Sequence, residues 1–128
     1  MSAKKIVVID DDPDQQAGLQ VRLTASGYDV SSARDAMQAI AVVRKVKPDL
    51  ILLDIGLPGG DGHTVIARLK TLGPLASIPV IVLSAMEPAD NVERMRAAGA
   101  VAYFQKPANN ELLLAEIRKA LGETVPQQ

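Results

Sequence analysis

The stretch "KIVVIDDDPDQQ", residues 5–16, joins an apolar segment directly to a run of carboxylates. Residues 5–10 have the β-branched, apolar composition of a strand that is buried on both faces, as in the centre of a parallel sheet. Asp12 followed by Pro13 is typical of a helix N-cap and its first helical position. The stretch therefore predicts a strand, a short acidic turn and a helix, which together begin an α/β fold.

The same alternation of strand and helix patterns repeats along the chain. Strands are expected at residues 5–10, 29–33, 50–54, 79–85 and 101–104. Helices are expected from Asp12 to Gly27, around Ala36, Ile40 and Val43, around Val65, Leu69 and Leu72, over about 88–98, and around Leu113, Ile117 and Leu121. Short connections between such units predict a five-stranded parallel sheet with helices on both faces, a doubly wound three-layer sandwich.

Composition narrows the classes of protein to be considered. A chain of 128 residues is long enough for one domain, expected over residues 1–122, with 123–128 as a polar tail or truncated linker. No apolar run approaches the ~18 residues of a membrane span, and "MSAKK" does not resemble a signal peptide, so a cytoplasmic protein without a membrane partner is expected. The absence of cysteine excludes disulfides and thiolate zinc sites. A net charge of −1 gives no reason to expect direct binding of nucleic acid.

Polar side chains stand at the carboxyl ends of the expected strands. These side chains are Asp10 and Asp11 after the first strand, Asp54 after the third, Ser84 in the fourth and Lys106 after the fifth. In open parallel sheets, ligands bind beyond these ends, close to the point where the strand order reverses. The sequence therefore predicts a functional site at this edge of the sheet.

A site with three carboxylates requires a positive partner. If the first and third strands are neighbours, two carboxylates about 5 Å apart repel each other by about 3 kcal/mol at an effective dielectric constant of ~20. Oxygen ligands without His or Cys favour Mg²⁺, with Mn²⁺ as the alternative. Mg²⁺ usually binds one or two carboxylates together with a phosphate oxygen, which indicates phosphoryl chemistry. Lys106 and Ser84 offer an ammonium group and a hydroxyl to the remaining phosphoryl oxygens, and one carboxylate would be the acceptor.

Four motifs together resemble a known family. They are "VVIDDDPD" at 7–14, "DLILLDIGLPGGDG" at 49–62, "VIVLSA" at 80–85 and "GAVAYFQKP" at 99–107. In order and spacing they are similar to the receiver domain of two-component response regulators, over about residues 4–121. The resemblance implies the flavodoxin-like strand order 2-1-3-4-5.

The resemblance also implies roles for individual residues at the strand ends. Asp54 looks like the phosphoacceptor, which would take a phosphoryl group from a sensor histidine kinase or a phosphotransfer protein. Asp10 and Asp11 look like metal ligands, together with Asp54 and the backbone carbonyl of Gly56. The protein would then be a signalling domain that catalyses only its own phosphorylation and dephosphorylation.

A conformational switch is implied in the same way. Ser84 and Lys106 would contact the phosphoryl group, and Tyr103 would turn inward as Ser84 moves. The fourth helix, near 88–98, is weakly anchored, so the face formed by this helix, the fifth strand and the fifth helix would change shape. That face would bind a downstream protein or effector domain, or a second copy of the chain.

Other functions fit the sequence less well. An EF-hand counted from Asp10 would place Gln15 and Val21 where Gly and Glu are needed. A binder of flavin mononucleotide would have to place a phosphate against the acidic first loop. A haloacid-dehalogenase-type phosphatase also begins with Asp-x-Asp and uses a lysine and Mg²⁺, but it needs further acids after that lysine. A degenerate receiver that acts only as an interaction module would lack the acceptor, the acidic pair or the lysine, and none is missing here.

Overall fold

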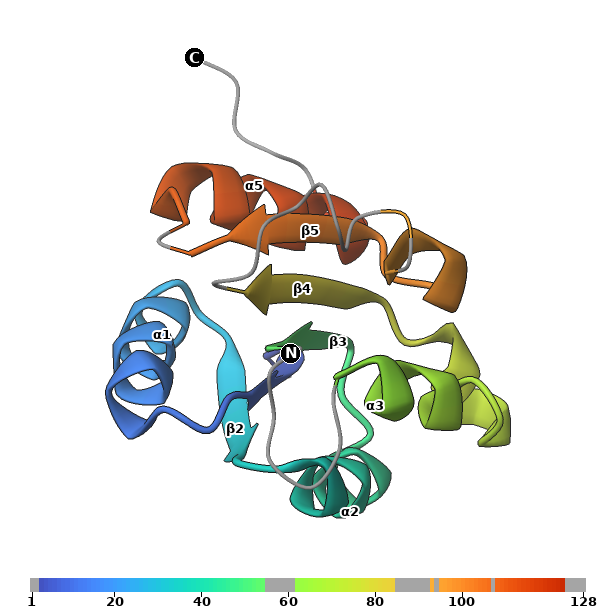
Figure 1. The fold of residues 1–128 in the computed structure, drawn as a ribbon. Helices are drawn as coiled ribbons and strands as arrows, with labels where there is room; N and C mark the ends of the chain where they lie inside the picture. Colours follow the sequence, from blue (N-terminus) through green and yellow to red (C-terminus); the bar gives the residue numbers. More distant parts are fainter. Residues whose placement is uncertain (1–2, 55–61, 85–92, 94, 107, 124–128) are drawn as a thin grey trace.

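A computed structural model describes residues 3–54, 62–84, 93, 95–106 and 108–123, and it contains the predicted alternation of strands and helices (Figure 1). The strands are β1 (Lys5–Ile9), β2 (Asp29–Ala33), β3 (Leu50–Leu53), β4 (Val80–Ser84) and β5 (Ala102–Gln105). The helices are α1 (Pro13–Ala25), α2 (Ala36–Val46), α3 (Gly62–Leu69), the 3₁₀ helix η1 (Gly73–Ser77) and α5 (Asn110–Ala120). Residues 93 and 95–98 are also helical.

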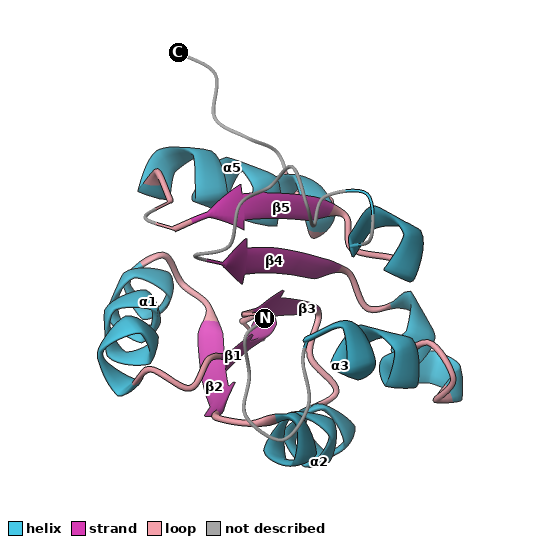
Figure 2. Cartoon of the chain, in the orientation of Figure 1, coloured by secondary structure: helices cyan, strands magenta, loops and turns pink. Residues whose placement is uncertain are grey.

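The strands form one parallel sheet in the order β2-β1-β3-β4-β5, as the sequence predicted. Helices cover both faces of the sheet, as Figure 2 shows. Ile9, the last residue of β1, is in register with Ala33 of β2 and with Leu53 of β3. Because the strands are parallel and in register, the residues that follow Ile9 and Leu53 leave the sheet at the same edge.

Two apolar clusters, one on each face of the sheet, explain why the central strands are almost entirely apolar. Val7 and Ile9 face a cluster that includes side chains of α2 and α3, whereas Ile6 and Val8 face a cluster built with α1 and α5. All residues of β3 and β4 are buried. Successive strand side chains point to opposite faces, so a strand covered on both faces needs an apolar residue at every position.

The first helix begins as predicted. The side chain of Asp12 accepts hydrogen bonds from the backbone N–H groups of Asp14, at 2.9 Å, and Gln15, at 3.4 Å, and Pro13 is the first helical residue. Leu19 and Leu23 are buried against the sheet. The acidic stretch therefore divides, since Asp12 caps a helix while Asp10 and Asp11 remain at the end of β1.

The third helix is shorter than the sequence predicted. It ends at Leu69, and the expectation that it includes Leu72 is wrong. Gly73 has a φ of 58°, and Pro74 disfavours a helical conformation in the residue before it, so the chain turns here and continues as η1. Leu72 is nevertheless half-buried and packs against the core, which is why the apolar pattern extends beyond the end of the helix.

The last helix carries the predicted apolar stripe. Leu113 and Ile117 are buried, and Leu121, directly after the helix, packs against the same cluster. Leu114, beside the stripe, is half-buried against that cluster. Within the part of the chain that the structure describes, no helix is both long enough and apolar enough to cross a bilayer.

Candidate functional site

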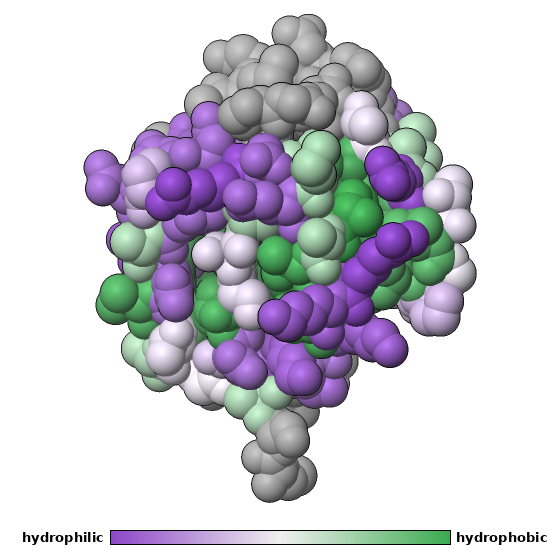
Figure 3. All heavy atoms as spheres, turned by 90° about the horizontal axis from the view of Figure 1, so that it is seen from below, coloured by the Kyte–Doolittle hydropathy of each residue, from purple (hydrophilic) through white to green (hydrophobic). Residues whose placement is uncertain are grey.

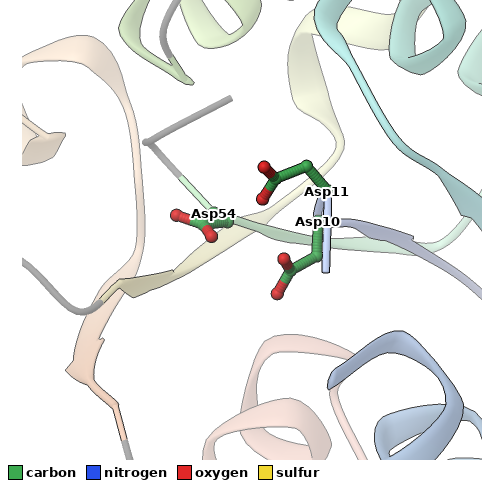
Figure 4. Close-up of side chains that lie close together, drawn as sticks. All are labelled: Asp10, Asp11 and Asp54. Atoms are coloured by element: carbon green, nitrogen blue, oxygen red, sulfur yellow. The ribbon is translucent and has the colours of Figure 1, made fainter. Parts of the chain in front are cut away.

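Two aspartates are held at one edge of the sheet by backbone hydrogen bonds. The N–H of Asp10 donates to the carbonyl of Ala33 at 3.0 Å, which continues the β1–β2 ladder by one residue. The N–H of Asp54 donates to the carbonyl of Ile9 at 2.9 Å, which continues the β1–β3 ladder. The backbone of both residues is thus fixed by the sheet, and their side chains extend beyond it (Figure 4).

Three carboxylates come together at this edge. Asp10, Asp11 and Asp54 each offer one oxygen, and these oxygens lie within 4.8 Å of one another. The side chains differ in exposure, because Asp10 is only 3% exposed, Asp54 is half-buried and Asp11 is exposed. The Asp12 N–H donates to Oδ1 of Asp10 at 3.0 Å, so the start of α1 also orients the buried carboxylate.

Lys106, directly after β5, reaches this cluster from across the sheet. Its Nζ donates to Oδ2 of Asp10 at 2.7 Å and to Oδ2 of Asp54 at 3.1 Å. The backbone N–H of Lys106 donates to the carbonyl of Ser84 at 2.7 Å, so the β4–β5 ladder continues to the residue that carries the ammonium group. Burial lowers the pKa of Lys106, but hydrogen bonds and charge from Asp10 and Asp54 outweigh it and leave the pKa above its usual value of 10.5.

The charge of the cluster matches a divalent cation. Three carboxylates and one ammonium group have a formal charge of −3 + 1 = −2. All the candidate ligand atoms on Asp10, Asp11 and Asp54 are carboxylate oxygens, which suit hard cations such as Mg²⁺. These residues therefore fit the predicted ion in both charge and donor type.

The other predicted site residues lie on neighbouring strands or outside the described chain. Ser84 is buried at the end of β4, next to the backbone of Lys106. Tyr103 is half-buried on β5, in register with Val82. It packs against the apolar cluster to which α2 and α3 contribute side chains. Gly56, predicted to offer a carbonyl oxygen to the metal, lies outside the residues that the structure describes.

One positioning residue was missed by the sequence analysis. Gln16 in α1 is 8% exposed, and its Nε2 donates to the carbonyl of Ala33 at 2.6 Å, the same carbonyl that accepts from the N–H of Asp10. This bond ties the first turns of α1 to the ends of β1 and β2. The sequence did contain a sign of this role. Gln16 is polar, yet its spacing from Leu19 and Leu23 places it on the buried face of the helix.

The model of one protein family matches most of the chain. The response regulator receiver domain matches residues 6–118, a range that contains all four strand-end positions of the site and the whole sheet except Lys5. The chain belongs to the response regulator receiver domain family. The strand order and the acidic edge of this receiver domain agree with the resemblance inferred from its four motifs.

Named relatives of this receiver domain include a short protein and a longer one. Sporulation initiation phosphotransferase F of Bacillus subtilis is 32% identical over 130 residues, which cover 98% of this chain and 97% of that protein. The DNA-binding dual master transcriptional regulator RpaA of Synechocystis is 38% identical over 125 residues, or 96% of this chain. The aligned part is only 52% of RpaA, so the receiver domain spans about half the length of that relative.

A solved structure supports the same assignment. The BeF₃-activated N-terminal receiver domain of RstA from Klebsiella pneumoniae superposes with a TM-score of 0.83. It is 31% identical, and the match covers 92% of this chain and 98% of that one. This chain therefore shares the fold of that receiver domain over most of its residues.

Proposed function

We propose that Asp54 accepts a phosphoryl group from a phosphohistidine of a sensor histidine kinase or of a phosphotransfer protein. The observation that carries this proposal is the position of Asp54 in a cluster with a formal charge of −2, within hydrogen-bond distance of Lys106. Asp54 is also more exposed than Asp10, which is almost fully buried. Among the carboxylates that contact Lys106, Asp54 is therefore the one that an incoming donor can reach.

The proposed transfer is a displacement at phosphorus. A carboxylate oxygen of Asp54 forms the new O–P bond, and the N–P bond of the phosphohistidine breaks with its electron pair remaining on the imidazole nitrogen. Lys106 lies 3.1 Å from Oδ2 of Asp54, and a short movement of its Nζ would pair it with a phosphoryl oxygen. The chain thus provides both the nucleophile and one cation that stabilises the negative charge of the transferred group.

The proposed metal ligands are Asp10, Asp11 and Asp54, with the carbonyl of Gly56 as a further ligand. Mg²⁺ bound there, or Mn²⁺ in its place, would neutralise charge on the phosphoryl oxygens. Asp10 is held by two donors, the N–H of Asp12 at 3.0 Å and Nζ of Lys106 at 2.7 Å, so its carboxylate is oriented before any ion binds. This orientation of a ligand by neighbouring groups lowers the entropic cost of binding.

We further propose that phosphorylation is read out on the face made by the helical residues 93 and 95–98, β5 and α5. Ser84 is buried at the end of β4, within one backbone hydrogen bond of Lys106, so a movement of either residue toward a phosphoryl group would be transmitted to the other. Tyr103 lies on the adjacent strand and packs against the same cluster as the buried Met95. A shift at Ser84 would therefore alter packing on this face, to which a downstream protein or a second copy of the chain would bind.

Phosphorylation by a small donor tests the proposal directly. Acetyl phosphate with Mg²⁺ should add one phosphoryl group to the chain by intact-mass measurement, and chelation of the metal should prevent the addition. Asp54→Asn should abolish the addition, whereas Asp49→Asn, an exposed aspartate at the other edge of the sheet, should leave it unchanged. Unchanged labelling of the Asp54 variant would reject Asp54 as the acceptor.

The same experiment separates the two alternative functions. A degenerate receiver that acts only through protein interactions would show no phosphoryl addition to any variant. A haloacid-dehalogenase-type phosphatase would release phosphate continuously and would carry its phosphoryl group on Asp10, where peptide mapping would find it. Labelling that maps to Asp54 and decays after the donor is removed would exclude both.

A further inference from the structure

A groove lies between α2 and α3 and continues past their ends toward η1. Its first part, about 300 Å³, has apolar walls that include Met37 and Ile40 of α2 and Val65 of α3. Its second part, about 570 Å³, has apolar walls that include Leu72 and Leu75. Arg44 lines both parts, so the two adjoin along one side of α2.

This groove leaves apolar surface open to solvent. Met37 is 84% exposed, the largest exposure of any large hydrophobic side chain among the described residues. Leu72 and Ile78, at the other end, are only half-buried. Figure 3 views the molecule from the side on which α2 lies and shows apolar surface between polar side chains. Methionine adapts its shape easily, and for this reason it is common on surfaces that bind the apolar face of a helix.

The charged residues that line the groove in the described part of the chain are all positive. Arg44 and Lys47 come from α2 and its C-terminal cap, and Arg68 comes from α3. Among the residues that the structure describes, no carboxylate lines either part, and none of the three cationic groups makes an ion pair or side-chain hydrogen bond. The described acids on either side of α2 have backbone partners elsewhere, because Asp35 caps the start of α2 through the N–H of Gln38 and Asp49 accepts from the N–H of Lys5. The chain as a whole has a net charge of −1, so this positive surface is a local feature.

We propose that this groove binds an amphipathic helix of a partner protein, with acidic side chains on either side of its apolar face. The apolar side chains would pack on Met37, Ile40 and Leu72, and the acidic ones would pair with Arg44 and Arg68. α2 has 11 residues and is therefore about 16 Å long, which corresponds to about three turns of a bound helix. The groove is built without Asp54, Lys106 or the acidic edge, so this inference does not depend on phosphoryl transfer.

Binding of a defined peptide would test the groove. The probe is a synthetic helix with leucines at i, i+3, i+4 and i+7 and glutamates on its flanks, compared with a peptide of the same composition whose leucines are scrambled around the helix. Chemical shifts of ¹⁵N-labelled chain should change along α2, α3 and η1 with the first peptide, and much less with the scrambled one. Raising the salt concentration should weaken binding, because ion pairs at the rim of the groove are screened.

Matched variants make the test specific. Arg44→Glu with Arg68→Glu should weaken binding about tenfold, whereas Lys45→Glu with Lys119→Glu, the same change of charge outside the groove, should change it by less than about twofold. Met37→Glu changes an exposed side chain and should also weaken binding, which keeps the test valid if the double arginine variant does not fold.

Three results would overturn the proposal. The first is equal weakening by the control pair, or shifts that map to another face. The second is binding to vesicles rich in anionic lipid without any preference for the amphipathic peptide, since the partner would then be a membrane. The third is a concentration-dependent change of the same resonances without peptide, which would make a second copy of this chain the occupant.

Discussion

The two edges of the sheet use charged residues in opposite ways. At the carboxyl edge, Asp10 and Asp54 share the single ammonium group of Lys106, and one of these carboxylates is almost fully buried. At the amino edge, the Asp49 carboxylate is exposed and accepts from the N–H of Lys5 at 2.7 Å, while the N–H of Asp49 donates to the carbonyl of Lys5 at 2.8 Å. At the amino edge the Asp49 carboxylate is thus paired with a backbone N–H group, whereas the carboxyl edge concentrates negative charge.

From this difference we infer that the amino edge serves stability and the carboxyl edge serves binding. A second contact near the amino edge joins distant parts of the chain, because the Tyr28 hydroxyl, just before β2, donates to Oε1 of Glu123, beyond α5, at 2.9 Å. At the carboxyl edge, like charges are brought together at a cost in free energy that a bound cation would remove.

The largest expected effect is on metal binding. Asp11→Asn removes one unit of negative charge from the carboxyl edge without breaking a contact of Lys106, and it should weaken Mg²⁺ binding about 100-fold, or ~2.8 kcal/mol. Asp49→Asn makes the same chemical change at the amino edge and should have no effect. Calorimetric titration with Mg²⁺ measures both, and equal affinities for the two variants would contradict the assignment of the metal site.

Removal of the shared cation is the second test. Lys106→Met leaves Asp10 and Asp54 without their partner, and it should lower the free energy of unfolding by about 1–3 kcal/mol in the absence of Mg²⁺. Lys5→Met removes an exposed ammonium group at the amino edge and should cost less than about 0.5 kcal/mol. Denaturant titration compares the two, and added Mg²⁺ should restore part of the loss in the Lys106 variant alone. Equal losses of unfolding free energy in the two variants would mean that the ammonium group of Lys106 stabilises the fold no more than that of Lys5.

The pH dependence of this difference is the third test. Because the pKa of Lys106 is raised in the folded protein, its stabilising contribution is complete below pH 10.5, the usual pKa, and is lost as the pH rises through the higher value. The difference in unfolding free energy between wild type and Lys106→Met should therefore be constant from pH 7 to about 9.5 and shrink above 10.5. A difference that grew with pH would contradict the raised pKa.

The smallest expected effect is near the amino edge. Tyr28→Phe removes one hydrogen bond, from the hydroxyl to the exposed Glu123 carboxylate, and should lower the free energy of unfolding by about 0.5–1.5 kcal/mol. Burial, and then the hydrogen bond and charge of Glu123, raise the pKa of Tyr28 above 10.0, so the unfolded chain releases this proton first and wild type loses stability as the pH rises above 10.0.

The phenylalanine variant should lack that alkaline loss. Glu123→Gln keeps a hydrogen-bond acceptor and should reduce the loss without removing it. If wild type and Tyr28→Phe lost stability in parallel above pH 10.0, the contact with Glu123 would have no role in holding the two segments together.

Most of the site could be predicted because each of its residues stands at the end of a strand. Asp10, Asp54 and Lys106 follow apolar runs in the sequence, and the structure brings their side chains into direct contact. Gln16 could not be assigned a role in the same way, since its bond to the Ala33 carbonyl depends on how α1 packs across β2. The end of α3 was predicted wrongly because Leu72 continues the apolar pattern of the helix. Leu72 packs against the core from a position beyond the helix.

The sequence alone determined the alternation of strands and helices, the cap at Asp12 and the identity of the acidic residues. These features depend on local patterns, namely side-chain periodicity, backbone restriction by proline and hydrogen bonding to nearby N–H groups. Other features became clear only from the folded chain. Lys106 bonds to both Asp10 and Asp54, and Asp10 is buried while Asp11 is exposed. Arg44 and Arg68 line the same groove. Such relations join residues that are far apart in the chain, and distance, burial and shared charge exist only after the sheet has brought them together.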